Sequence, residues 1–212
     1  MKFVHLHTHS HYSLLDGLAK IDELIDAAKE KKMKALALTD HGAMYGVIEF
    51  FQKAKKAGIK PIIGEEMYVL PYGETIQGEK AKTNNHYFHL VLLAKDNVGY
   101  QNLIKLTSIA QLEGMYYKPR VDWEILKKHK EGLIALSGCL GGEIADAIHG
   151  NQRKKAVECA IAFEEIFGKE NFYLELQPHG KTNHQQQVNK ELIKISKETG
   201  IPLVATNDIH YA

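Results

Sequence analysis

The chain has 212 residues, of which 44% are hydrophobic and 25% are charged, a composition typical of a globular protein. Its 27 lysines and arginines nearly balance its 26 aspartates and glutamates, so no overall positive field favours nucleic acid and any contact with a polymer must be local. Two cysteines are too few for a disulfide framework, and no membrane span or secretory signal is recognisable. We therefore expect one large cytoplasmic domain.

Short apolar runs alternate with amphipathic stretches along most of the chain. Strands are predicted over residues 3–6, 35–39, 61–70, 88–95, 132–137, 172–176 and 203–207. Helices are predicted over residues 21–32, 44–57, 98–113, 123–129, 142–149, 153–167 and 183–199. Residues 71–87 read as a polar loop, so the strands on either side of it are expected to form an antiparallel hairpin. The alternation elsewhere predicts a parallel sheet covered by helices.

Histidines occupy alternate positions at the start of the chain. Because alternate residues of a strand share a face, His5, His7, His9 and His11 are expected to point in one direction, as at the beginning of a metal site. Asp208 follows the last predicted strand and precedes His210 at the same spacing. Further candidate ligands lie in other predicted strands or just past them, several at the strand ends: Asp40, His41, Glu65, Glu66, His89 and Cys139. Ligands in these places favour a closed α/β barrel, whose chemistry lies at the C-terminal rim.

Some of these side chains also have a purely structural interpretation. Asp16 precedes Gly17 and could be a turn carboxylate that accepts backbone hydrogen bonds. Cys139 could be an inert buried thiol, as free cysteines commonly are. Neighbours on a strand face opposite ways, so only one of Glu65 and Glu66 can face the histidines.

Several phrases of the sequence together resemble the polymerase and histidinol phosphatase (PHP) family, and the resemblance runs over essentially the whole chain. They are Leu6–Ser10 (LHTHS), Ser13–Gly17 (SLLDG), Thr39–Gly42 (TDHG), Gly64–Glu66 (GEE), His89, Cys139 and Asp208–His210 (DIH). Further phrases are similar to the branch of the family at the N-terminus of bacterial replicative DNA polymerase III alpha subunits: Gly58–Gly64, His89–Lys95, Gly99–Leu103 and Leu136–Leu140. We therefore expect residues 1–212 to be a PHP domain, the N-terminal part of a longer polymerase subunit.

The resemblance implies an α/β fold, a distorted seven-stranded (β/α)7 barrel, with two or three divalent transition metals at its C-terminal rim. The family's Gly-x-Glu pattern selects Glu66. Carried over position by position, the ligands would be His7, His9, Glu66 and Asp208 for one ion, Asp16, His41 and His210 for a second, and Glu66, His89 and Cys139 for a third.

This ligand set points to a particular chemistry. Neutral imidazole with carboxylate suits zinc, manganese or iron, whereas an all-oxygen set would suit magnesium or calcium. A bridging carboxylate such as Glu66 can hold two ions, which favour hydrolysis of a phosphodiester by metal-bound hydroxide. We expect a phosphoesterase in which Glu66, His9 and Asp208 are catalytic. The resemblance implies a 3′ to 5′ exonuclease that proofreads the 3′ end of a DNA primer.

Other residues are expected to assist. His5 and Asp40 are interpreted as residues that orient ligands, and His179, just past a predicted strand, could contact substrate phosphate. The segment 115–120 reads as a loop whose aromatic residues and two cations, Lys118 and Arg120, suit stacking on bases and neutralising phosphate.

Two other functions remain open from the sequence. In one, the metal cluster only stabilises a structural module that braces the polymerase and a separate proofreading exonuclease subunit. In the other, the chain is a small-molecule phosphatase or a pyrophosphatase. Every aligned ligand position keeps a residue that can bind metal, which favours activity over a purely structural role.

Overall fold

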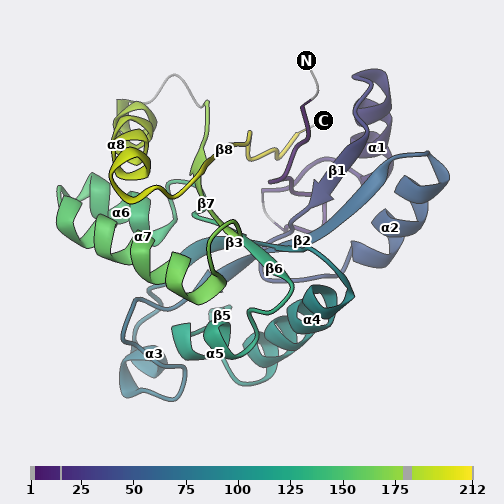
Figure 1. Cartoon of the computed structure of the whole chain (residues 1–212). Coiled ribbons are helices and arrows are strands. Elements are labelled where there is room, and N and C mark those ends of the chain that lie inside the picture. Colours follow the sequence, from purple (N-terminus) through teal and green to yellow (C-terminus); the bar gives the residue numbers. More distant parts are fainter. Residues whose placement is uncertain (1–2, 15, 179–182, 212) are drawn as a thin grey trace.

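The computed structural model describes residues 3–14, 16–178 and 183–211, whose strands form a curled sheet with helices packed around it (Figure 1). The strands are β1 (Ala35–Leu38), β2 (Lys60–Val69), β3 (Phe88–Ala94), β4 (Met115–Tyr116), β5 (Lys118–Val121), β6 (Leu133–Leu136), β7 (Phe172–Leu176) and β8 (Leu203–Ala205). Their order is β4-β5-β2-β3-β6-β7-β8, and β1 pairs with β2. The predicted α/β barrel is confirmed in the form of a half-barrel whose sheet does not close by a continuous ladder.

The direction of β3 decides which residues meet at the rim. β2 and β3 are antiparallel, as the polar segment between them predicts, and β3 is also antiparallel to β6. The pairs β1 with β2, β6 with β7, and β7 with β8 are parallel. The N-terminal end of β3 therefore lies at the same rim as the C-terminal ends of its neighbours. His89, the second residue of β3, reaches the rim for this reason.

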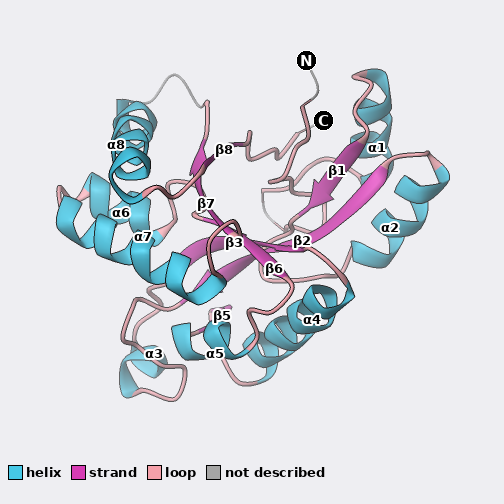
Figure 2. Cartoon of the chain, in the orientation of Figure 1, coloured by secondary structure: helices cyan, strands magenta, loops and turns pink. Residues whose placement is uncertain are grey.

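The helices predicted from apolar periodicity are all present. They are α1 (Ile21–Glu30), α2 (Val47–Lys56), α4 (Asn97–Leu112), α5 (Trp123–Lys128), α6 (Glu143–His149), α7 (Arg153–Phe167) and α8 (Asn183–Thr199). Figure 2 shows α1 and α2 beside β1 and β2, α4 and α5 below the sheet, and α6 to α8 on the side of β7. Among the described residues, none of these helices has the length and apolarity that a membrane crossing requires.

Residues 3–6 do not form the predicted strand. The segment runs beside β1, where the amide of Ala37 donates to the carbonyl of His5 and the amide of Thr39 donates to the carbonyl of Thr8. The amide of Thr8, however, donates to the hydroxyl of Thr39 at 2.9 Å in place of a strand partner. A side chain thus interrupts the ladder, and within the described part of the chain an isolated bridge between Thr8 and Ile209 joins the two ends of the sheet.

Two further segments differ from the sequence prediction. The polar stretch 71–87 contains a short helix, α3 (Glu79–Thr83), and the predicted loop at 115–120 is the hairpin of β4 and β5. Tyr117, between the two strands, has a φ of 58°, the left-handed conformation of a tight turn. Strands of two and four residues are too short for an alternating pattern to be recognised.

Candidate metal centre

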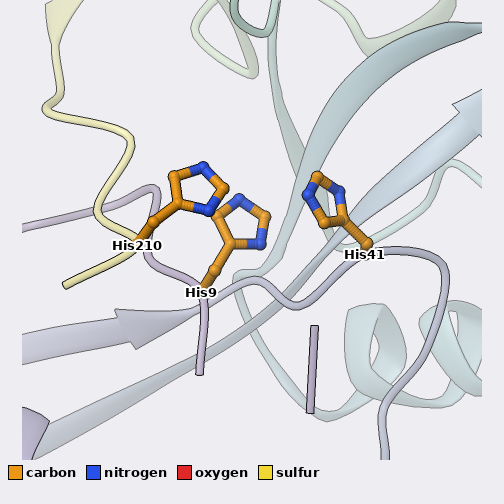
Figure 3. A group of neighbouring side chains, drawn as sticks. All are labelled: His9, His41 and His210. Atoms are coloured by element: carbon orange, nitrogen blue, oxygen red, sulfur yellow. The ribbon is translucent and has the colours of Figure 1, made fainter. Parts of the chain in front are cut away.

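His7 and His9 are fully buried on the segment that joins the two ends of the sheet. The amide of His9 donates to the carbonyl of Ile209 at 2.7 Å, and the amide of Ile209 donates to the carbonyl of His7 at 3.1 Å. This contact brings the last strand beside the first histidines. Figure 3 shows the resulting group, in which the His9 ring lies 4.4 Å from that of His210 and 4.1 Å from that of His41, centroid to centroid.

Glu66 lies at the centre of the histidines. Its side chain on β2 is 1% exposed. Its Oε1 lies 3.3 Å from Nε2 of His7 and 3.0 Å from Nδ1 of His89. Its Oε2 lies 2.5 Å from Nδ1 of His41 and 3.5 Å from Nε2 of His9. One carboxylate therefore touches four imidazoles from three separate segments, which is the arrangement of a bridging ligand.

Asp208 brings a second carboxylate to the same place. Its Oδ1 lies 3.3 Å from Nε2 of His7, 3.4 Å from Nε2 of His9 and 3.1 Å from Nε2 of His210. Asp208 has a φ of 47°, a left-handed conformation that aspartate tolerates better than most residues. The chain thus bends just past β8, and both Asp208 and His210 reach the cluster from this bend.

Asp16 lies on the outer side of the group. Its Oδ2 is 3.0 Å from Nε2 of His41, and its Oδ1 is 3.9 Å from Nδ1 of His210. Half of the Asp16 side chain is exposed, whereas that of Glu66 is buried. The cluster is therefore closed on its Glu66 side and open to solvent near Asp16.

Cys139 and His89 complete the group on a third side. The sulfur of Cys139 lies 3.6 Å from Nδ1 of His89 and 3.7 Å from Oε1 of Glu66, and it accepts a hydrogen bond from the amide of Gly141 at 3.4 Å. Cys139 follows β6 by three residues and is partly buried. Its thiol thus faces the carboxylate and does not pack into the apolar core.

The unpartnered atoms of this group fit a cation. Among the described residues, several buried atoms make no hydrogen bond although each lies within 3.9 Å of a carboxylate oxygen or ring nitrogen of the group: Nε2 of His7, Nε2 of His9, Nδ1 of His41, Nδ1 of His210 and Oε2 of Glu66. Buried polar atoms without partners are costly and rare in folded proteins. Three overlapping groups of nitrogen and oxygen atoms are close enough to share an ion. Nitrogen, oxygen and sulfur donors together suit divalent transition metals.

The electrostatics of the group also favour bound cations. Burial would raise the pKa of Glu66, but His7 and His89 outweigh it and hold the pKa well below its usual range. Burial likewise lowers the pKa of His7, yet the carboxylates of Glu175 and Glu66 raise it well above its usual value. Burial together with Glu66 and Asp208 raises the pKa of the Cys139 thiol well above its usual range. The carboxylates of Glu66 and Glu175 thus favour positive charge in the buried interior of the cluster.

Ser13 and Asp40 support the ligands from behind. The hydroxyl of Ser13 lies 3.0 Å from Nδ1 of His9, accepts the backbone amide of His41 at 3.1 Å and donates to Asp40 at 2.8 Å. Asp40 also accepts the backbone amide of Ser10 at 2.7 Å. Asp40 therefore acts through Ser13 on the His9 ring and on the backbone of His41.

Glu175 is a buried carboxylate that the sequence interpretation missed. It lies on β7, is 1% exposed, and its Oε1 is 2.7 Å from Nδ1 of His7. Its sequence neighbours Leu174 and Leu176 are apolar. A charged residue inside an apolar strand was the available signal, because such a residue is seldom buried without a partner.

His5, a further predicted residue, does not join the group. The ring of His5 packs against Phe3, and its Nδ1 lies 3.5 Å from the amide nitrogen of Asn207, so His5 contacts the chain near β8 and none of the ligands. His179 lies outside the described residues. The prediction that His5 orients a ligand therefore has no contact to support it.

The two cations of the β4–β5 hairpin have different fates. Arg120 is 2% exposed, and its guanidinium donates to the carbonyls of Ala81 at 2.6 Å and Asn84 at 2.9 Å. Arg120 thus fastens α3 to the hairpin, and the prediction that it contacts phosphate is corrected because its donors are already used inside the domain. Lys118 instead places its ammonium 5.3 Å from the ring centroid of Tyr68.

Comparison with known families gives one match that covers most of the chain. The sequence profile described as PHP domain matches residues 5–179. This range contains seven of the nine side chains that meet at the rim and excludes Asp208 and His210.

Curated relatives match over nearly the whole chain. DNA polymerase III subunit alpha is 50% identical in Borreliella burgdorferi, 46% in Treponema pallidum and 47% in Thermus aquaticus. The matches cover 99%, 100% and 100% of this chain but only 18%, 18% and 17% of the relatives. The chain therefore spans less than a fifth of the length of the polymerase subunits that it resembles.

Solved structures share the fold at low sequence identity. An amidohydrolase from Chromobacterium violaceum is 16% identical with a TM-score of 0.61, and the match covers 98% of this chain and 87% of that one. A two-domain protein from Bacteroides vulgatus that contains a predicted PHP-like metal-dependent phosphoesterase is 15% identical with a TM-score of 0.58, over 98% of this chain and 51% of that one. At these identities the likeness establishes the fold alone.

Proposed function

The chain belongs to the PHP domain family, and we propose that it hydrolyses phosphodiesters as a metal-dependent domain of a bacterial DNA polymerase III alpha subunit. The observation that carries this proposal is the group of unpartnered ring nitrogens around the buried carboxylate of Glu66. The identity to polymerase alpha subunits supports a place within such a longer chain, and we propose that residues 1–212 form its N-terminal, cytoplasmic domain.

Three overlapping sets of side chains would hold the ions. The first set is His7, His9, Glu66 and Asp208, the second is Asp16, His41 and His210, and the third is Glu66, His89 and Cys139. The first set is supported by the single oxygen of Asp208 that faces both His7 and His9 within 3.4 Å. The third is supported by the approach of the Cys139 sulfur to both of its partners. Zinc, manganese and iron are the metals that such donors suit.

The chain's own residues would determine where the chemistry occurs. When bound, the ions supply Lewis acidity, which makes water nucleophilic near neutral pH and offsets charge on a phosphate. Glu66 contributes a negative charge to two of the sets. His9 lies between Glu66 and Asp208, and Asp208 in turn contacts His210 of the second set. We therefore propose Glu66, His9 and Asp208 as the residues on which hydrolysis depends most. Substrate would enter near Asp16, where the group is exposed.

The proposed substrate is the 3′ end of a DNA primer. Lys118 supports this choice because Tyr68, whose ring it covers, also contacts the rings of His41 and His89. An ammonium one ring away from the metal ligands could neutralise a backbone phosphate. The remainder of the polymerase subunit would present the primer, and a proofreading exonuclease subunit is a second proposed partner.

The proposal is tested with a labelled primer whose 3′-terminal base is mismatched, since a frayed end is cheaper to unstack. The complete polymerase subunit, loaded with zinc or manganese, is expected to shorten this primer from its 3′ end and to stop when a chelator is added. Asp208→Asn and His9→Ala are each expected to abolish the shortening while far-UV circular dichroism stays unchanged. Neither His9 nor Asp208 belongs to an apolar core cluster of the described residues, and the backbone hydrogen bond from the His9 amide to Ile209 is left in place.

The rival functions predict other outcomes of the same assay. Hydrolysis of pyrophosphate or of a small phosphate ester, with the primer left intact, would identify a small-molecule phosphatase. A fully loaded subunit that cleaves none of these substrates but binds a proofreading subunit would identify a structural module. Shortening that persists in Asp208→Asn at equal metal content would place the exonuclease elsewhere in the polymerase.

A further inference from the structure

We propose that Glu175 is a positioning residue that fixes three parts of the metal centre relative to one another. We call these parts its arms: the His7 ring, the loop that carries Cys139 and the segment that carries Asp208. This inference rests on the proposed metal binding and assigns a role to a residue outside the nine ligands. Glu175 lies on β7 beneath the cluster, and its carboxylate contacts residues from three other segments: His7 of the N-terminal segment, Gly138 after β6 and Thr206 after β8.

The first arm is the His7 ring. Oε1 of Glu175 lies 2.7 Å from Nδ1 of His7, whereas Nε2 of the same ring faces Glu66 and Asp208 at 3.3 Å. A carboxylate beside Nδ1 favours the tautomer whose proton sits on Nδ1 and donates to Glu175. The lone pair of Nε2 then points at the metal centre, and the ring cannot rotate without breaking this hydrogen bond.

The second arm is the loop that carries Cys139. Oε2 of Glu175 accepts the backbone amide of Gly138 at 3.1 Å, one residue before the cysteine. Gly138 has a φ of +81°, and a Cβ at this position would lie 2.7 Å from the carbonyl oxygen of His89. The loop is therefore tightly bent against β3. The hydrogen bond to Glu175 fixes this bend. It thereby fixes the direction in which the Cys139 side chain points.

The third arm leads to Asp208. The hydroxyl of Thr206 donates to Oε1 of Glu175, and the amide of Thr206 donates to the carbonyl of Leu176 on the same strand. Thr206 precedes Asp208 by two residues and is fully buried. Gln177 closes the group by donating to Oε1 of Glu175 at 3.0 Å.

These contacts require a carboxylate. Glu175 is 1% exposed and accepts from four donors, three on Oε1 and one on Oε2. A glutamine has the same shape but only one acceptor oxygen, and its NH2 group would face a donor in place of an acceptor. Glu175→Gln therefore releases either the His7 ring or the Gly138 loop.

The test compares zinc affinity between the polymerase subunit and its Glu175→Gln variant by competition with a chromogenic chelator. Loss of a residue that orients metal ligands weakens binding about 10- to 100-fold, and this is the range that we expect. Glu143→Gln is the matched control, because Glu143 is also buried, at 3% exposed, but accepts from the backbone of Tyr72 outside the cluster. Its zinc affinity should equal that of the parent.

A second readout separates positioning from general damage to the fold. With cobalt in place of zinc, the visible absorption bands report the ligand geometry, so they should shift in Glu175→Gln and stay fixed in Glu143→Gln. Should Glu175→Gln not fold, Thr206→Val removes one donor to the same carboxylate at nearly constant volume. Its zinc affinity should fall about 2- to 10-fold, the equivalent of one hydrogen bond.

The outcomes distinguish this inference from the proposed function. A parent protein that binds zinc, together with a folded Glu175→Gln or Thr206→Val variant of equal affinity and unchanged cobalt spectrum, would overturn the role of Glu175 and leave the metal centre in place. An equal loss in Glu143→Gln would also overturn it. A parent protein that binds no zinc would overturn the metal centre itself and this inference with it.

Discussion

Glu66 is the residue on which most of the other contacts depend, since each of its oxygens faces two histidines. Glu66→Gln keeps the volume but removes the negative charge that offsets the ions. We expect this variant to lose at least about one ion per chain and all hydrolysis, because a neutral amide bridges metals poorly. Metal analysis of the purified variant, paired with the primer assay, measures both effects.

Glu65 provides the control for that substitution. It is fully buried on the opposite face of β2, where the hydroxyl of Thr107 donates to its carboxyl group. Burial raises the pKa of Glu65 to about 8, so the group is mostly neutral at pH 7. Glu65→Gln should therefore keep both its metal and its activity at that pH. A loss of metal equal to that of Glu66→Gln would show that any change in this strand disrupts the centre.

Arg120 and Lys118 test the placement of the hairpin cations. Arg120→Ala leaves the carbonyls of Ala81 and Asn84 without their donors, and we expect it to lower the free energy of unfolding by about 3 kcal/mol in urea denaturation. Lys118→Ala should leave this free energy within about 0.5 kcal/mol. If Lys118 holds one phosphate, its removal should reduce the slope of log affinity for single-stranded DNA against log salt by about 0.7. A loss of stability in Lys118→Ala together with a lower salt slope in Arg120→Ala would contradict this assignment of the two residues.

The sequence could indicate the ligands but not the residues that hold them. The nine candidate ligands are recognisable because they stand in motifs, most of them at or near the ends of predicted strands. Ser13 stands in the SLLDG motif, but the motif does not show that its hydroxyl contacts Asp40 and the amide of His41. Glu175 stands in no motif, because its importance comes from partners that are distant in sequence, such as His7, 168 positions away. Arg120 was misinterpreted for a related reason, because composition cannot show that a loop cation is buried.

At the scale of the elements, periodicity was informative where elements are long. The seven predicted helices are present because each of them buries apolar residues against the core, as α1 does with Ile21, Leu24 and Ile25. The strands β4 and β5 and the helix α3 were missed because they are too short for a periodic pattern to repeat within them. The N-terminal strand was predicted from its apolar pattern. In the structure the amide of Thr8 donates to the side chain of Thr39, so the backbone ladder of a strand is interrupted there.

The junction between α4 and β6 gives a prediction at this scale. A Cβ on Gly99, in the first turn of α4, would lie 1.8 Å from the carbonyl oxygen of Gly132, which is also bonded to the amide of Lys95. We expect Gly99→Ala to lower the free energy of unfolding by about 2–3 kcal/mol, because backbone must move to admit the methyl group. Ser108→Ala, at an exposed position of the same helix, should change it by less than about 0.5 kcal/mol. Equal urea midpoints for the two variants would contradict this packing.

At the scale of the whole molecule, the fold brings distant parts of the chain to one rim. His7 and Asp208 meet there because the two ends of the sheet are joined through Thr8 and Ile209. The reversed direction of β3 adds His89 from a strand that would otherwise begin at the far end. A half-barrel with one reversed strand thus collects ligands from nearly its full length.

The metal content of the purified protein tests this arrangement most directly. The ions bind only to the folded state, so the measurement is made on folded protein. The protein is reconstituted with zinc or manganese, and unbound ions are then removed. Converging nitrogen, oxygen and sulfur donors predict about two or three ions per chain. Less than about one ion per chain after reconstitution would contradict a metal centre at this rim.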